Sequence, residues 1–191
     1  MKHKYAIPAK KELRIAISGA SGCGNTTVST LLADTLGIPC INYTFRNLAK
    51  ELDMPLKKVI EQAKTDFSFD RIVDSRQVEQ ALKSSCVLGS RLAIWMLKEA
   101  DLKVYLYASE EVRAGRIFQR EGGSLEHIKE FTAMRDSDDT RRYKELYNID
   151  NTDYAFADML IDTEHYTPDL IVELIIDELL RRSLIVPKAD T

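Results

Sequence analysis

Residues 19–27 place three glycines between a short apolar run and a stretch of helical spacing. Before the glycines, residues 14–18 form a short apolar segment with β-branched residues, which is typical of a buried strand. After the glycines, apolar residues recur at helical spacing until Gly37 and Pro39 end the pattern, at Val28, Leu31, Leu32 and Leu36. The chain therefore predicts a strand, a glycine-rich loop and a helix, in that order.

The loop matches the phosphate-binding motif GxxxxGK[ST] except at Asn25, where the motif has lysine. A plain glycine-rich turn is the alternative, but the flanking strand and helix favour a nest of backbone N–H groups for phosphate. Thr26 offers a hydroxyl to Mg²⁺, whereas Asn25 replaces a full positive charge with a neutral amide. The predicted phosphate-binding residues are Gly19, Ala20, Ser21, Gly22, Cys23, Gly24, Asn25, Thr26 and Thr27.

Length and composition predict one domain. A chain of 191 residues with 45% hydrophobic residues can fill a single core. The net charge of −3 disfavours nucleic acid as a partner, and no apolar run is long enough to cross a membrane. Three scattered cysteines indicate a reducing compartment, so we expect a cytoplasmic protein.

The pattern between the ends of the chain alternates strands and helices, which predicts a parallel sheet covered on both faces. We expect a flexible basic arm over residues 1–12, one domain over 13–183 and a tail over 184–191. The predicted strands are 13–18, 40–43, 85–89, 102–107 and 158–162.

Positive charge is concentrated at a few places. Arg113, Arg116 and Arg120 share one face of a predicted helix, either as a solvated face partly neutralised by glutamates or as an anion site. Arg46 and Arg91 follow the second and third strands, where an open parallel sheet binds ligands. Unless these two are plain surface arginines, they predict a second anion site opposite the loop.

A further set has the spacing i, i+4 and i+7 on one helical face: Arg135, Asp139 and Arg142. The aspartate either aims the two arginines at a ligand or forms an ordinary salt-bridge ladder within the helix. The residues alone leave both interpretations open.

Taken together, these segments resemble the P-loop nucleoside monophosphate kinases, and most closely the short cytidylate kinases of archaea and some bacteria. The resemblance covers about residues 13–182 and rests on residues 14–27, 44–50, 70–71, 74–79, 90–97 and 142–150. It implies a P-loop NTPase-type α/β three-layer sandwich with a five-stranded parallel sheet, a helical monophosphate-binding segment over about 44–83 and a helical lid over about 115–145. It also implies transfer of the γ-phosphate of ATP to CMP or dCMP with Mg²⁺.

The resemblance also implies roles for single residues. Arg46 and Arg91 resemble monophosphate clamps, while Arg135, Asp139 and Arg142 resemble residues that read the base or hold phosphate. Arg116 and Arg120 resemble lid arginines, which with Arg91 are the expected catalytic residues, and Thr26 is the expected metal ligand. The expected partners are ATP and a nucleoside monophosphate, with no nucleic acid and no membrane, in a monomer or weak dimer.

Two positions depart from the family pattern. Asn25 replaces the loop lysine, and Gly89 stands where the family has an acid after the third strand. We expect an active kinase in which Arg116, or failing that Arg120, substitutes for the lysine. The alternative is a catalytically impaired nucleotide-binding protein that acts as a sensor or regulator.

Overall fold

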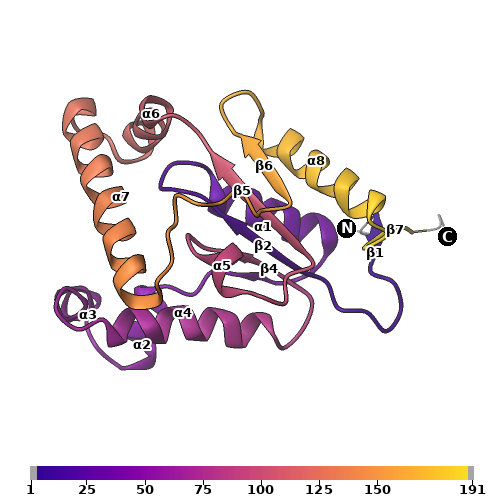
Figure 1. Cartoon of the computed structure of the whole chain (residues 1–191), viewed down its shortest axis with the longest axis horizontal. Helices are drawn as coiled ribbons and strands as arrows, with labels where there is room; N and C mark the ends of the chain where they lie inside the picture. The colour runs from indigo at the N-terminus through magenta and orange to yellow at the C-terminus, as the bar shows by residue number, and fades with distance from the viewer. Residues whose placement is uncertain (1–3, 189–191) are drawn as a thin grey trace.

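A computed structural model describes residues 4–188 and has a parallel sheet at its centre (Figure 1). The five strands are β2 (Arg14–Ser18), β3 (Cys40–Ile41), β4 (Cys86–Gly89), β5 (Leu102–Tyr107) and β6 (Met159–Asp162). Their order is β3-β4-β2-β5-β6, and each neighbouring pair is parallel. The direction of winding changes at β2, so a crevice opens beyond its carboxyl end, where the glycine-rich loop begins. All five predicted strands are present.

Helices cover both faces of the sheet, because alternate residues of β2 point to opposite sides. Ile15 and Ile17 are fully buried against α1 (Asn25–Leu36) and α8 (Pro168–Arg181). Ala16 points the other way, toward α5 (Ala93–Met96) and α4 (Ser68–Ala81). The predicted three-layer α/β sandwich is confirmed.

Two left-handed glycines set the limits of α1. Gly24 precedes the helix with φ of 93°, and Gly37 follows it with φ of 68°. Gly37 donates its N–H to the carbonyl of Asp34, and Ile38 donates to Ala33. A side chain at either glycine would strain the backbone, so these residues fix where the helix begins at the loop and where it ends.

The segment between β3 and β4 forms a small helical unit of its own. It contains α2 (Phe45–Glu51), α3 (Leu56–Ala63) and then α4. Leu48, Val59 and Val73, one from each helix, are buried together with Tyr43. This third apolar cluster packs the three helices against one another, while α4 also contacts the sheet through Ala81. The unit lies within the segment of about 44–83 that was predicted to be helical.

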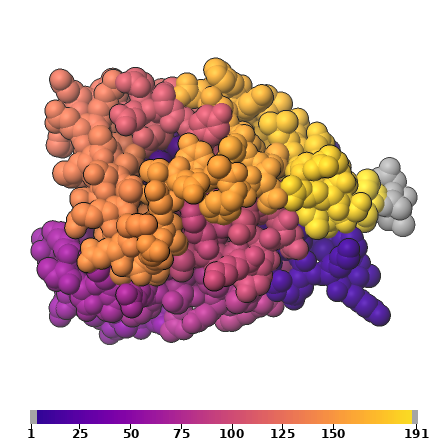
Figure 2. All heavy atoms as spheres, viewed as in Figure 1, coloured from indigo at the N-terminus to yellow at the C-terminus, as the bar shows by residue number. Residues whose placement is uncertain are grey.

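Two helices follow β5 and form the other side of the molecule: α6 (Glu110–Glu121) and α7 (Leu125–Tyr147). Ser109 and Ser124 cap them, each accepting a hydrogen bond from a backbone N–H three residues on. The end of α7 reaches α4, where Arg142 pairs with Asp70. In Figure 2 the orange atoms of this end meet the violet atoms of the α2–α4 unit. Over residues 4–188, no helix combines the length and the apolar character that crossing a membrane requires.

The two ends of the chain are held together, which corrects the expectation of a flexible arm and a free tail. Strand β1 (Tyr5–Ala6) pairs antiparallel with β7 (Val186–Pro187), and Lys188 donates its N–H to the carbonyl of Lys4. Tyr5 and Ile7 also pack against the core beside α1 and α8. Polar sequence suggested a solvated arm, but two-residue strands have no periodicity that a sequence can reveal. Residues 1–3 and 189–191 of the predicted arm and tail lie outside the described residues.

Candidate active site

A cavity of about 710 Å³ lies beyond the carboxyl ends of β2 and β4. The glycine-rich loop forms one side of it, and one face of α4 forms the other. Five arginines from three different parts of the chain line it: Arg91, Arg116, Arg120, Arg135 and Arg142. Its volume is in the range of ligand pockets, which are about 300–1,000 Å³. The glycine-rich loop and Arg91, at which the sequence predicted two anion sites, therefore line the same cavity.

The loop has a backbone that only glycine adopts easily. Gly22 has φ of 87° and Gly24 has φ of 93°. A Cβ at Gly22 would also lie 2.8 Å from the carbonyl oxygen of Arg113 on α6. Left-handed glycines of this kind turn successive N–H groups toward one point, which creates the concave site that binds anionic oxygens.

Asn25 stands at the first residue of α1 and ties the loop to itself. Its Nδ2 donates to the carbonyl of Gly19 at 2.6 Å. Its Oδ1 is buried and has no hydrogen-bond partner among residues 4–188. The amide thus closes the loop from end to end but adds no charge to the cavity, where a lysine would contribute a cation.

Arg91 joins the two sides of the cavity. Its Nη2 donates to Ser21 Oγ in the loop at 2.7 Å, and its Nη1 pairs with Asp139 on α7. Burial lowers the pKa of its guanidinium, although arginine keeps its charge at any physiological pH. Arg91 therefore lies beside the loop in the same cavity, and its role as a phosphate clamp stays a prediction.

The arginines of α6 have separate partners rather than a shared solvated face. Arg113 is buried, pairs with Asp136 on α7 at 2.6 Å and donates to the carbonyl of Ser21 at 3.2 Å. Arg116 donates to Thr163 through Oγ1 at 2.8 Å and the carbonyl at 2.6 Å, and to the carbonyl of Gly22 at 3.2 Å. Two of the three arginines therefore hold the loop.

Arg120 is the exception on α6. It is exposed, pairs with the adjacent Glu121 at 2.5 Å and still lines the cavity. An exposed pair of this kind is weak, so Arg120 can leave it at little cost when a ligand arrives.

The i, i+4, i+7 set on α7 lines the cavity as predicted, but its members pair with other elements. Asp139 pairs with Arg91, and Arg142 places Nη2 at 2.7 and 2.8 Å from the two carboxylate oxygens of Asp70. Arg135 has no ion-pair partner among the described residues. The intrahelical ladder is therefore wrong, and so is the expectation that Asp139 aims its two helical neighbours.

Two predicted residues are not where the sequence placed them. Arg46 is exposed on α2 and does not line the cavity, although its neighbour Phe45 does. Cys23 is only 2% exposed, and its side chain packs into the core between α1 and the sheet. Cys23 is part of the loop, as the motif predicts, but its side chain packs into the core and does not line the cavity. A role for Arg46 as a clamp stays a prediction.

Gly89, at the end of β4, is in tight contact with α1. A Cβ there would collide with Ser29 Oγ and would lie 2.7 Å from Ser29 Cβ. Ser29 is itself fully buried, and its hydroxyl has no partner within the described part of the chain. The acid that the family pattern places at this position therefore has no room unless α1 or residue 29 changes.

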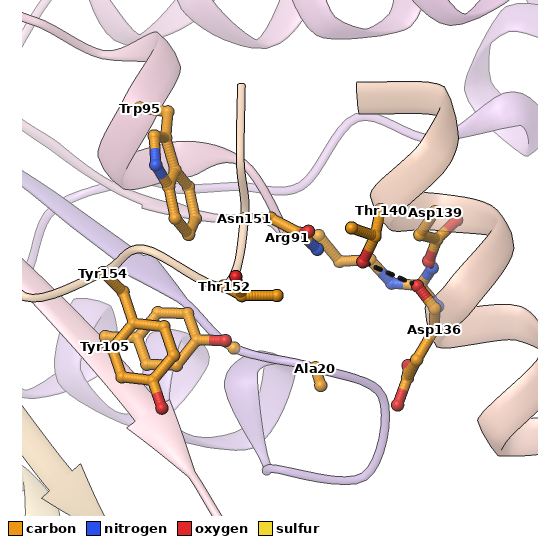
Figure 3. Close-up of a pocket in the computed structure, with 11 residues that line it drawn as sticks. Ala20, Arg91, Trp95, Tyr105, Asp136, Asp139, Thr140, Asn151, Thr152 and Tyr154 are labelled. Atoms are coloured by element: carbon orange, nitrogen blue, oxygen red, sulfur yellow. Dashed lines mark hydrogen bonds and ion pairs between the residues drawn. The ribbon is translucent and has the colours of Figure 1, made fainter. Parts of the chain in front are cut away.

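A smaller cavity of about 280 Å³ adjoins the first and shares Arg91 and Asp139 with it. Figure 3 shows the rings of Trp95, Tyr105 and Tyr154 on one side, opposite the side chains of α7. Tyr105 and Tyr154 stack with centroids 3.9 Å apart, and Trp95 meets Tyr105 edge-on at 6.0 Å. The aromatic rings therefore form the wall of this cavity that faces α7.

Comparison of the sequence with known proteins identifies relatives of this chain. Residues 14–165 match the profile of the cytidylate kinase-like family. Cytidylate kinase 2 of Borreliella burgdorferi is 45% identical over 176 residues, covering 90% of this chain and 98% of the relative. Cytidylate kinase of Pyrococcus horikoshii is 39% identical over 175 residues, covering 89% and 91%.

The chain belongs to the cytidylate kinase-like family. Among solved structures, shikimate kinase from Acinetobacter baumannii in complex with shikimate has a TM-score of 0.64 at 19% identity, covering 92% of this chain and 97% of that one. At that identity the likeness concerns the fold alone, and it supports the P-loop kinase architecture.

The cytidylate kinase-like protein also has cavity residues that the sequence reading missed. Asp70, Asp74 and Gln77 share one face of α4 and line the cavity. Tyr147 on α7 donates its hydroxyl to Asp74 at 2.7 Å. The pKa of Asp74 is raised to about 6, chiefly by burial; the hydrogen bond from Tyr147 opposes this rise, and the charge of Asp70 contributes to it. Asp70, Asp74 and Gln77 have the spacing i, i+4 and i+7, which is the same signal that identified the set on α7.

Proposed function

We propose that this cytidylate kinase-like protein is a nucleoside monophosphate kinase that transfers the γ-phosphate of ATP to CMP or dCMP. The observation that carries the proposal is the position of Arg91, which contacts Ser21 of the phosphate loop and Asp139 of α7 at once. A phosphate bound by the loop and a second one bound by the arginines would meet at this guanidinium. The family relationship supports the same reaction class.

Phosphoryl transfer needs alignment and charge neutralisation rather than a protein nucleophile. The loop N–H groups would hold the donor phosphates, and Thr163 holds the guanidinium of Arg116 beside Gly22. Arg91 would bind the acceptor phosphate in exchange for Asp139. Closure of α6 and α7 over the cavity would exclude water, which otherwise competes with the acceptor.

Thr26 is the residue of this chain that would hold Mg²⁺. It is exposed, lines the cavity and follows the loop at the start of α1. Residues 4–188 contain no cluster of three histidine, cysteine or acidic side chains that could bind a metal without substrate. Mg²⁺ commonly takes few protein ligands and keeps several waters, so a single hydroxyl with phosphate oxygens fits its chemistry. Bound with ATP, it would neutralise charge on the transferred group.

A coupled assay with ATP and Mg²⁺ against CMP, dCMP, UMP and AMP tests the proposal. We expect the highest kcat/KM with CMP or dCMP. Arg91→Ala should lower kcat/KM for CMP by roughly 10²- to 10³-fold, because it removes a preorganised charge at the transferring group. The matched control is Arg71→Ala, an exposed arginine of α4 outside the cavity, which should retain activity.

A catalytically impaired nucleotide-binding protein is the second candidate, favoured by Asn25 and by the crowding at Gly89. If ATP binds by calorimetry while no monophosphate is phosphorylated, the kinase proposal fails and this candidate stands.

A further inference from the structure

We infer that Gln77 of α4 selects the base of the acceptor nucleotide by accepting a hydrogen bond from its exocyclic amino group. The inference rests on the proposed function, because it concerns the acceptor end of the same cavity. It assigns a specificity-determining role to a residue that belongs neither to the phosphate loop nor to the arginine clusters.

The first observation is an unsatisfied acceptor. Gln77 is 6% exposed, and its Nε2 donates to the main-chain carbonyl of Tyr43 at 3.0 Å. Since a carbonyl only accepts, this bond fixes which way the amide points, and Oε1 is left on the other side. Within residues 4–188, Oε1 is buried and has no hydrogen-bond partner. A buried acceptor left in this state is costly unless a ligand supplies the donor.

The second observation is the character of the cavity wall around it. Asp70, Asp74 and Gln77 present only acceptors to the cavity from one face of α4. Asp70 is already paired with Arg142, and Asp74 accepts from Tyr147, so this face offers no free cation to a phosphate. The neutral base is therefore the part of a nucleotide that fits against α4. Tyr43, Phe45 and Val73 line the same region and offer apolar and aromatic surface to a ring.

A wall of acceptors discriminates between pyrimidines. Cytosine carries an amino group at position 4 and can donate to Gln77 Oε1. Uracil carries a carbonyl oxygen there, which would face Oε1 without a proton between them. A site built to bind an N–H group rejects an analogue that lacks it much more strongly than an apolar pocket rejects an extra atom.

Equilibrium binding by calorimetry, without ATP, tests the inference with CMP, UMP and the 2-pyrimidinone ribonucleoside monophosphate that lacks the amino group. The wild-type protein should bind CMP about 10- to 100-fold more tightly than either analogue. Gln77→Met removes the acceptor at similar volume and should bring the CMP-to-analogue ratio close to one. Gln80→Met, on the same helix but outside the cavity, should keep the wild-type ratio.

The ratio separates recognition from structure, because each protein is measured with both ligands. Loss of the bond to Tyr43 would weaken CMP and its analogues alike and would cancel. Equal affinity of the wild-type protein for CMP and the 2-pyrimidinone analogue overturns the inference without any variant, as does an unchanged ratio in Gln77→Met. Discrimination in binding without turnover would instead refute the kinase proposal and leave the role of Gln77 intact.

Discussion

Arginines in and beside the cavity form ion pairs with aspartates of other elements. Arg91 pairs with Asp139, Arg113 with Asp136, and Arg142 with Asp70. Each arginine is therefore held in one orientation, and under the proposed function a phosphate would replace the carboxylate of Asp139 at Arg91. Such preorganisation lowers the cost of aligning charged side chains in the reaction.

We predict that Arg116 supplies the charge missing at Asn25, because its hydrogen bonds to Thr163 and to the carbonyl of Gly22 hold it beside the loop. We expect Arg116→Ala to lower kcat/KM by about 10²- to 10³-fold in the natural background. In an Asn25→Lys background the restored lysine should reduce that loss to less than about tenfold. Steady-state kinetics of the four proteins measures the coupling.

Arg120→Ala, made in the same two backgrounds, is the comparison for this cycle, since Arg120 lines the cavity but pairs only with Glu121. An equal loss from Arg116→Ala in both backgrounds would show that Arg116 does not replace the lysine.

The contact between β4 and α1 decides which residue can stand at the last position of β4. Gly89 and Ser29 lie so close together that there is no space for a side chain at residue 89. The missing acid is thus part of a consistent packing arrangement, and restoring it is a structural change as well as a chemical one.

We expect Gly89→Ala to destabilise the fold by about 1–3 kcal/mol, because its Cβ overlaps Ser29. Ser29→Gly should relieve that overlap, so the double variant should lose less stability than the two single changes combined, even though glycine within a helix costs about 1 kcal/mol. Urea unfolding of the four proteins gives the coupling. Additive losses would mean that the strands and helix adjust without conflict. Gly115→Ala, where a Cβ meets open space, is the control.

Much of the element order follows from the sequence, and the site follows less well. Strand β2 and its neighbour β5 consist mostly of buried residues, so their apolar runs predicted both strands within one residue. The partners of Asp139 and Arg142 were wrong, because helical spacing shows which residues share a face and not what that face meets. Gln77 was missed for the same reason: its spacing from Asp70 and Asp74 shows that the three share a helical face, but not that this face lines the cavity.

At the scale of the whole molecule, α7 connects the two sides of the cavity. The helix forms three ion pairs with other parts of the chain: Asp136 pairs with α6, Asp139 with Arg91 beyond β4, and Arg142 with α4. Tyr147 adds a hydrogen bond to Asp74 at the far end. Figure 1 shows α7 at one end of the molecule and the paired strands β1 and β7 at the other. Strands β1 and β7 are therefore held far from the cavity.

The α4–α7 contact predicts a pH dependence of stability. Burial raises the pKa of Asp74 from 3.8 to about 6, with Asp70, Arg142 and Tyr147 around it. The folded state holds this proton more tightly than the unfolded state, so the contribution is fully present below pH 3.8 and is lost as pH rises through about 6. Above that pH the buried charge costs on the order of 2–3 kcal/mol.

Asp74→Asn removes the charge and keeps an acceptor for Tyr147. The variant should be more stable than the natural protein at pH 7.5, and the difference should shrink toward pH 4. Urea unfolding across this range measures it, with Asp177→Asn on the exposed side of α8 as the control. A difference that is constant with pH would mean that Asp74 does not titrate in this window.

The three pairs along α7 have a consequence for how the two substrates influence each other. Under the proposed function, a nucleotide that displaces Asp139 from Arg91 would also disturb the pairs about one turn to either side on α7. Occupancy on the donor side would then change affinity on the acceptor side, and thermodynamic reciprocity would require an equally large effect in the opposite direction.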